Sequence, residues 1–403
     1  MTDTMRELLQ KLLRDIRSTP GYRELDEGGL VELVMNRVME LSYETLTMKE
    51  SDELIDLALA RLQSGYGILS DLIESDTIQE IMVNDHRSVF VEEKGHLHRV
   101  PHEFSDREEL EEMIRMIAAS VHREFNEMNP ILDARLADGS RVNAVYRNVA
   151  LDGPALTIRK FAGNKITIGE MIKKGTLTHD CASFLLTVMR KGYNLFISGG
   201  TSSGKTTFLN ALCDVIEQSG ERVVVIEDSR ELMLDRIPNL VQMECHNANS
   251  AGKGLIGMDM LIRTSLRMRP DRIIVGEVRG REVADMLQAM NTGHSAVSTG
   301  HGNSVRGMMR RMEAMYLMGA QIPIDAIRAQ IVEGIDICIH LARTREGKRK
   351  VMEVQELIGY TDGEYVFNPL FLTDEDGVLV NTGNPMRNPY REHLYEEHDE
   401  RTE

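Results

Sequence analysis

The chain has 403 residues, more than one hydrophobic core usually serves, so we expect two or more domains. Its composition, with 42% hydrophobic and 28% charged residues, is typical of a globular protein and argues against a disordered or fibrous one. The formal net charge is −17 and only 5% of the residues are aromatic, so the chain repels phosphate backbones and has few side chains for stacking bases. A general nucleic-acid-binding protein is therefore disfavoured, and we expect no direct contact with nucleic acid.

Membrane and disulfide signals are also missing from the sequence. No apolar stretch approaches the roughly 20 residues that cross a bilayer, and residues 1–20 alternate charges with leucine instead of showing a signal-peptide block. The four cysteines lie far apart with no Cys-x-x-Cys pair, which excludes a disulfide framework and a zinc knuckle. We therefore expect a cytoplasmic protein with buried cysteines.

The first two regions differ in their hydrophobic pattern. Residues 1–62 are predicted to be a helical segment, with apolar residues at helical spacing over 8–16 and again over 30–41, and with Gly28-Gly29 separating the two helices. Residues 63–162 are predicted to be a small α/β domain, because short β-type runs alternate with turn signals and one helix. The strands are expected near 81–83, 89–91, 97–100 and 155–161, the helix at 107–121, and a hairpin turn at 137–140. Residues 162–165 are short and polar, and are the best candidate for a linker.

Strands and helices alternate over residues 163–372, which predicts a parallel sheet with covering helices. Strands are expected at 194–198, 222–226, 240–243, 272–275 and 296–298, with helices at 205–216, 258–267 and 281–290. Paired strands follow after Ile335, so the sheet should gain antiparallel edge strands. Residues 373–403 carry nine acidic residues against three arginines and are predicted to form an acidic, partly disordered tail.

The strongest motif is GGTSSGKT at 199–206, a complete phosphate-binding loop (P-loop) between a predicted strand and a predicted helix. Its glycines let the backbone approach phosphate oxygens, and N–H groups at the helix start converge on the anion. Lys205 should reach the β and γ phosphates, and the Thr206 hydroxyl can ligate Mg²⁺. The predicted nucleotide contacts are Gly200, Thr201, Ser202, Ser203, Gly204, Lys205, Thr206 and Thr207.

Hydrolysis needs acids at the ends of neighbouring strands, and the sequence offers two apolar strands that end in them. The strand at 272–277 ends in Glu277, which we expect to hold Mg²⁺ or its waters, and the strand at 223–228 ends in Glu227 and Asp228. We favour Glu227 as the general base, and the reverse division of roles stays open. The alternative is that such acids only pair with Arg230 or Arg279.

Two histidines flank a short strand in TGHSAVSTGH at 292–301. A metal site is disfavoured because His294 and His301 lack a third ligand at zinc spacing. We expect instead that His294 contacts the nucleotide and that His301 takes part in catalysis as a sensor of the γ-phosphate. The alternative is a structural histidine in a loop.

Arginines are concentrated in two places, although the chain as a whole is acidic. Residues 254–281 contain six arginines and three acids. In the small domain, Arg135, Arg141 and Arg159 flank the predicted hairpin and the strand after it. We expect Arg141 and Arg159 to act in catalysis by neutralising a triphosphate from a neighbouring domain or subunit. The alternative is solvated arginines in surface ion pairs.

Together these motifs resemble the type II/IV secretion-system ATPase superfamily, where they are the Walker A motif, Asp box, Walker B motif and His box, in this order. Residues 79–84 (QEIMVN), 138–143 (DGSRVN) and 156–161 (LTIRKF) look most like the tight-adherence (Flp) pilus-assembly branch. The resemblance covers about residues 64–360. Three departures are the missing tetracysteine zinc insertion, Ser229 in place of the usual proline, and the glycines on either side of His301.

The resemblance implies an α/β fold in which a PAS-like domain, residues 63–162, precedes a RecA-like P-loop ATPase domain, residues 163–372. It implies a homohexameric motor that hydrolyses ATP with Mg²⁺, the nucleotide being clamped between the two domains. Its partners would be an inner-membrane platform protein and, indirectly, pilin-like subunits. The protein would then associate peripherally with the cytoplasmic face of the inner membrane.

Rival classes fit the sequence less well. A GTPase is disfavoured because Asn164-Lys165-Ile166-Thr167 lacks the aspartate of a guanine motif and precedes the P-loop. A DNA-associated RecA-like helicase or translocase is disfavoured by the acidic balance and the few aromatic residues. A catalytically silent nucleotide-binding scaffold is disfavoured because Lys205, Thr206, Glu227 and Glu277 are all present.

Overall fold

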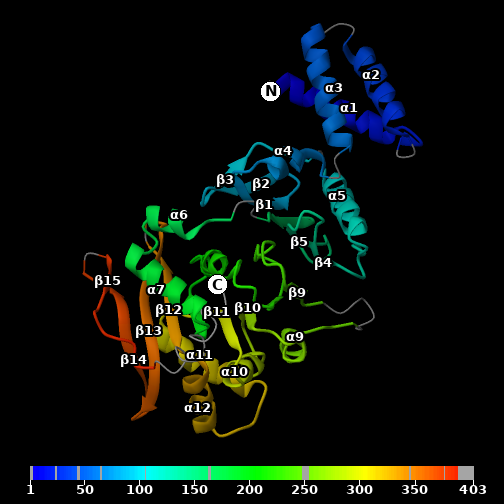
Figure 1. Cartoon of the computed structure of the whole chain (residues 1–403). Coiled ribbons are helices and arrows are strands. Elements are labelled where there is room, and N and C mark those ends of the chain that lie inside the picture. The colour runs from blue at the N-terminus through cyan, green and yellow to red at the C-terminus, as the bar shows by residue number, and fades with distance from the viewer. Residues whose placement is uncertain are drawn as a thin grey trace. The chain divides into compact units, whose positions relative to one another are not determined.

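The computed structural model describes residues 3–22, 25–42, 46–63, 66–104, 106–161, 165–246, 254–344, 346–375 and 377–388. The chain divides into two compact units, Met1–Gly163 and Asn164–Glu403 (Figure 1). The division falls within the polar segment at 162–165, where the sequence pattern changes. Among the described residues, no helix has both the length and the apolar character needed to cross a membrane.

The N-terminal unit begins with three described helices, α1 (Asp3–Ser18), α2 (Glu27–Ser42) and α3 (Met48–Gln63). They share an apolar cluster that includes Leu9, Leu12, Val34, Val38 and Leu54. Gly28 and Gly29 do not separate two helices, as the sequence suggested, but lie in the first turn of α2. The reason is Asp26, whose Oδ1 accepts the Gly29 N–H at 2.8 Å and so satisfies a donor at the start of the helix.

A six-stranded antiparallel sheet forms the rest of the N-terminal unit, with the strand order β3-β2-β1-β6-β5-β4. Its strands are β1 (Ile78–Asp85), β2 (Ser88–Glu93), β3 (His96–Val100), β4 (Ile131–Arg135), β5 (Arg141–Val145) and β6 (Ala155–Arg159). Two short helices, η2 (Gly67–Leu69) and α4 (Ser70–Glu74), precede the sheet, and α5 (Arg107–Ser120) follows β3. Alternate strand residues such as Leu156 and Ile158 are buried in one cluster with Leu110 and Ile114 of α5. One face of the sheet therefore packs on apolar side chains and the other is polar.

The C-terminal unit is built on a nine-stranded sheet of order β15-β14-β13-β12-β7-β11-β10-β8-β9. The strands from β12 to β9 run parallel, whereas β13, β14 and β15 are antiparallel additions at one edge. The parallel strands are β7 (Leu195–Gly199), β8 (Val223–Glu227), β9 (Leu240–Glu244), β10 (Arg272–Val278), β11 (Ser295–His301) and β12 (Ile337–Arg343). The antiparallel strands are β13 (Arg349–Thr361), β14 (Glu364–Thr373) and β15 (Leu379–Asn381).

Helices cover both faces of this sheet, because its central strands are apolar on both sides. One apolar cluster holds Leu195 and Ile197 of β7 with residues of α6 (Ile168–Lys173), α7 (His179–Arg190), α8 (Lys205–Leu212) and η3 (Cys213–Ile216). The other holds Phe196 with residues of α9 (Met258–Ser265), α10 (Val283–Asn291), α11 (Val305–Leu317) and α12 (Ile324–Gly334). Figure 1 shows α10, α11 and α12 grouped together beside the sheet. Successive residues of β7 thus pack into different layers, because side chains alternate between the two faces of a sheet.

The C-terminal stretch differs from the acidic tail that the sequence suggested. Residues 379–381 add β15 to β14, and Leu379 is 7% exposed. The N–H groups of Arg387 and Asn388 donate to the fully buried Glu356 carboxylate. The short apolar run at 378–380 and this buried acceptor outweigh the acidic composition, so residues up to 388 belong to the C-terminal unit. Residues 389–403 lie outside the described residues.

Candidate active site

The sheet order brings the carboxyl ends of four strands to one edge, and three of them carry a polar side chain. Strands β7, β11, β10 and β8 are neighbours and run parallel, so their carboxyl ends lie together. Gly199 ends β7 and His301 ends β11. Glu277 lies one residue before the end of β10, and Glu227 ends β8. Residues spread over about a hundred positions of the sequence therefore converge on one place.

The loop from Gly199 to the start of α8 has a conformation that its glycines permit. Gly204 precedes α8 with a φ of +91°, and Ser202 has a φ of +56°. A Cβ at Gly199 would lie 2.6 Å from the Leu341 carbonyl oxygen, so only glycine fits there. The loop leads directly into the helix, whose first N–H groups lack partners within the helix. Such a loop is suited to binding an anion.

Lys205, the first residue of α8, lies against this loop and is only 6% exposed. Its Nζ donates to the carbonyl oxygens of Gly199 at 3.2 Å and Gly200 at 3.1 Å, and lies 3.3 Å from Nδ1 of His301. Burial lowers the pKa of the Lys205 ammonium, an effect that Glu277 opposes and Arg279 reinforces. A bound anion would therefore stabilise the protonated form of this side chain.

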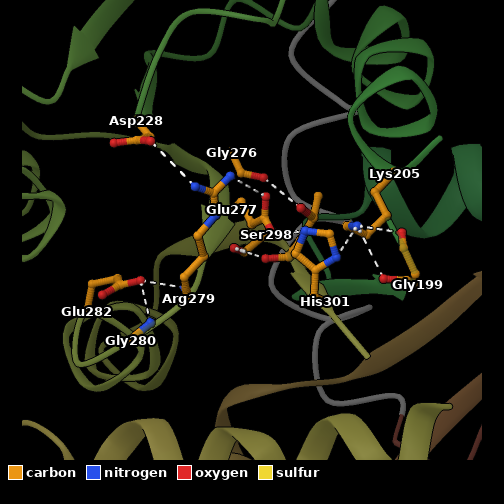
Figure 2. Close-up of polar contacts among 12 residues, drawn as sticks. Gly199, Lys205, Asp228, Gly276, Glu277, Arg279, Gly280, Glu282, Ser298 and His301 are labelled. Atoms are coloured by element: carbon orange, nitrogen blue, oxygen red, sulfur yellow. Dashed lines mark hydrogen bonds and ion pairs between the residues drawn. The ribbon is translucent and has the colours of Figure 1, made fainter. Parts of the chain in front are cut away.

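A line of polar contacts runs from Lys205 across the strand ends (Figure 2). Nε2 of His301 lies 2.9 Å from Oε1 of Glu277, and Nη2 of Arg279 donates to Oε2 of Glu277 at 3.0 Å. Nη1 of Arg279 lies 3.6 Å from Oδ2 of Asp228. Oε1 of Glu277 is buried and makes no hydrogen bond among the described residues, in spite of the short distance to His301. A carboxylate oxygen has two lone pairs, so Oε1 can accept a hydrogen bond from a bound water or ligand in addition to its contact with His301.

His301 lies between the lysine and the carboxylate in this line. Burial lowers the pKa of its imidazole, with Lys205 acting in the same direction and Glu277 opposing. This shift favours the neutral form of the ring. One ring nitrogen then donates a hydrogen bond and the other accepts one.

Glu227 is placed differently from Glu277. Its side chain is only 4% exposed, and Oε1 accepts the N–H groups of Glu231 at 2.9 Å and Leu232 at 3.1 Å. Gly276 on β10 makes room for it, because a Cβ there would lie 3.0 Å from Glu227 Cγ. This carboxylate therefore organises the loop that follows β8.

The structure does not bring His294 to the P-loop. His294 precedes β11, whereas His301 ends it, and the strand between them has seven residues, or about 23 Å at about 3.3 Å per residue. The neighbouring Ala296 N–H donates to Asn194, just before β7, which places this end of β11 at the amino edge of the sheet. His294 itself contacts the Thr292 hydroxyl at 3.2 Å. The sequence-based assignment of His294 to this nucleotide site is therefore corrected.

The other predicted loop residues lie in the P-loop or the first turn of α8. The Ser203 side chain is 1% exposed, and its hydroxyl has no hydrogen-bond partner among the described residues. Thr201, Ser202 and Thr207 are exposed, and Thr206 is partly exposed. These side chains surround the backbone that would hold the phosphates.

Most arginines of the 254–281 segment are engaged in ion pairs. Arg263 lies 3.1 Å from Asp259 and 3.2 Å from Asp285. Arg281 also reaches Asp259, at 3.1 Å. The buried Arg272 pairs with Glu221 at 2.7 Å, at the amino end of β10. For these arginines the structure favours the ion-pair interpretation over a role at a phosphate.

Arg135, Arg141 and Arg159 form a row on the sheet of the N-terminal unit. Arg135 is directly opposite Arg141 across β4 and β5, and Arg141 is directly opposite Arg159 across β5 and β6. The next position in the row is Glu80 on β1. Like charges directly opposite each other destabilise a sheet, and Glu80 offsets part of the charge of Arg159, so a bound anion would stabilise the row further.

Sequence reasoning missed two side chains that contact the P-loop or the strand leading into it. His340 on β12 is 8% exposed, and its Nδ1 lies 2.9 Å from the Ser198 hydroxyl. A histidine inside the apolar run of β12 was a signal that could have drawn attention to it. Arg349 donates from Nε to the Ser202 carbonyl oxygen at 3.2 Å. No spacing rule links Arg349 to the loop, since the two are far apart in the sequence.

Residues 63–361 match the family described as type II/IV secretion system protein. This range contains all the residues that make the polar contacts from Lys205 to Asp228 in Figure 2. The chain belongs to this family. A protein of Mycobacterium tuberculosis (strain H37Rv) that is named for conjugal transfer is 32% identical over 301 residues, which cover 73% of this chain and 85% of that protein. The chain is thus an ATPase of the secretion and pilus motors, and it uses a nucleotide.

Two solved structures show the same fold. The ATPase DotB of Legionella pneumophila has a TM-score of 0.52 and 22% identity, covering 73% of this chain and 80% of that one. The pilus retraction motor PilT with bound ADP has a TM-score of 0.52 and 20% identity, covering 80% of this chain and 85% of that one. The predicted α/β fold, an N-terminal domain followed by a RecA-like ATPase domain, is thereby confirmed.

Proposed function

We propose that this ATPase powers the assembly of a tight-adherence (Flp) pilus. The observation that carries the ATP-hydrolysis part of this proposal is the line of contacts from Lys205 through His301 to Glu277 at one edge of the sheet, since it joins a phosphate site to a buried carboxylate. Support for the pilus branch comes from residues 79–84, 138–143 and 156–161, which lie on and next to β1, β5 and β6. The partners would be an inner-membrane platform protein and, through it, pilin-like subunits.

We assign phosphate binding to the P-loop, and Mg²⁺ binding to Thr206 and Glu277. Backbone N–H groups of residues 200–206 and the Lys205 ammonium would bind the phosphates, with Thr207 beside them at the helix start. The Thr206 hydroxyl and Glu277 are oxygen donors, the type that Mg²⁺ prefers, and the Glu277 oxygen without a hydrogen bond fits such a role. Bound Mg²⁺ would neutralise phosphate charge. His301 would report the presence of the γ-phosphate to its neighbours.

The geometry supports Glu277 rather than Glu227 as the residue that orients the attacking water. Glu277 lies beside His301, which contacts Lys205, whereas the Glu227 carboxylate holds the N–H groups of a loop. We therefore propose that Glu277 both binds Mg²⁺ and orients the attacking water, in place of the division of roles that the sequence favoured. Glu227 would act as a positioning residue for the loop after β8.

We also propose that the motor is a homohexamer in which Arg141 and Arg159 neutralise the transferred phosphate. Their place in a row of like charges supports this role. Purified protein with Mg²⁺ and a non-hydrolysable ATP analogue should therefore show six times the chain mass by light scattering. A monomer at micromolar protein under these conditions would contradict the hexamer.

The pilus proposal is tested in the host by deleting the gene and complementing it with wild-type protein or Lys205→Ala. Surface filaments, counted by negative-stain electron microscopy, should disappear on deletion and return only with the wild-type protein. Normal filaments in the deletion strain would contradict the proposal. Loss of DNA transfer with filaments intact would point instead to conjugation, the role for which the Mycobacterium tuberculosis relative is named.

A further inference from the structure

The hairpin after the last parallel strand brings an arginine against the P-loop. Strand β12 pairs with β7, and the chain then turns back into β13, whose first residue is Arg349. Besides its hydrogen bond to the Ser202 carbonyl oxygen, Arg349 covers Gly204, where a Cβ would lie 3.1 Å from Arg349 Cδ. One side chain thus contacts the loop at two positions.

The guanidinium of Arg349 makes no ion pair with a carboxylate among the described residues. Arg263 and Arg279 each lie within ion-pair distance of two carboxylates. Among the described parts of the chain, Arg349 has no such partner, and its one side-chain hydrogen bond is to Ser202. The loop is therefore the group that fixes this guanidinium, and the guanidinium in turn restrains the loop.

Arg349 holds the P-loop at Ser202, the residue of the loop whose backbone conformation is strained. Ser202 has a φ of +56°, in the left-handed region that residues with a Cβ adopt at a cost. A peptide group is planar and trans, so the Ser202 carbonyl and the Ser203 N–H point in opposite directions. The Ser203 N–H is directed across the loop, 3.4 Å from the Gly200 oxygen. Holding the carbonyl from outside therefore aims this N–H into the loop.

We infer that Arg349 is a positioning residue that holds the P-loop in its nucleotide-binding conformation from outside. The inference rests on the proposed role of the loop as the nucleotide site. Because Arg349 acts through the backbone and not on the phosphate, its loss should weaken binding and leave the turnover of bound ATP unchanged. A role limited to stabilising the fold would instead lower the melting temperature and leave affinity unchanged.

The first test measures the affinity for ADP with Mg²⁺ by isothermal titration calorimetry. Arg349→Ala should raise Kd about tenfold, the typical effect of a lost hydrogen bond from a charged group, with kcat at saturating ATP within about twofold of wild type. The matched control is Arg343→Ala, which removes the exposed arginine directly opposite Arg349 in the same hairpin and should change Kd less than about twofold. Wild-type affinity in Arg349→Ala would overturn the inference.

A second test separates positioning from direct contact with the ligand. Glycine adopts a positive φ without strain, so Ser202→Gly removes the cost that Arg349 offsets. In the Ser202→Gly background, Arg349→Ala should raise Kd less than about threefold. A full tenfold loss in that background would mean that Arg349 touches the nucleotide itself, and the inference would be wrong. If wild-type protein binds no ADP, or Lys205→Ala binds it equally well, the nucleotide site has failed and not the role of Arg349.

Discussion

Glu277→Gln should bind ATP with near wild-type affinity and hydrolyse it about 10² to 10⁴ times more slowly, the usual contribution of a positioned proton acceptor. The substitution preserves the size and shape of a side chain that lies 2.9 Å from His301 and 3.0 Å from Arg279. It replaces the carboxylate with a neutral amide, so the site would lose the proposed proton acceptor and the proposed Mg²⁺ ligand. Single-turnover hydrolysis of bound ATP is the measurement, because it separates the chemical step from binding and release.

The matched variant is Glu227→Gln on the neighbouring strand. A glutamine oxygen still accepts the N–H groups of Glu231 and Leu232, so the loop after β8 should keep its form. We expect turnover within about tenfold of wild type. A dead Glu227→Gln beside an active Glu277→Gln would return the role of base to Glu227.

Arg159→Ala and Arg141→Ala should each lower ATP turnover strongly while changing nucleotide affinity little. An arginine that stabilises the transferred phosphate contributes on the order of 10³ to 10⁵ in rate. An arginine on a solvated sheet face contributes less than about 0.5 kcal/mol to stability and nothing to turnover. The two interpretations therefore differ by orders of magnitude in one ATPase assay.

Arg99→Ala is the control for the arginine row. Arg99 lies on β3 at the far edge of the same sheet, where it donates to the Arg87 carbonyl oxygen. Its loss should leave turnover unchanged. Near-normal rates in both Arg141→Ala and Arg159→Ala would mean that these arginines are solvated surface residues. Other groups would then have to neutralise the phosphate charge.

Much of the fold follows from local sequence patterns. The P-loop motif predicts its own strand and helix, and the apolar runs at 223–226 and 273–275 indicate the buried parallel strands β8 and β10. The acidic composition after residue 373 led us to expect a tail from that residue. Three apolar residues at 378–380 are nevertheless enough to add a strand, β15, to the edge strand β14. At this position a short apolar run determines the structure, and the average composition of the segment does not.

The site was predictable in its parts and not in its arrangement. The sequence offered Lys205, Glu277 and His301 as candidates, but only the sheet order shows that β11 separates β7 from β10 and so puts His301 between the other two. The error at His294 comes from strand polarity, since residues before and after one strand lie at opposite edges. Arg349 left no signal, because its contact depends on where the hairpin after β12 folds back.

If ATP is bound and hydrolysed at the P-loop beside Lys205, the Lys205→Ala variant should lose its steady-state ATPase activity. Lys205 contacts the carbonyl oxygens of Gly199 and Gly200 and belongs to neither apolar cluster of its unit, so the fold should persist. We expect no turnover above background with Mg²⁺ and ATP, at an unchanged melting temperature. A wild-type rate in this variant would contradict it.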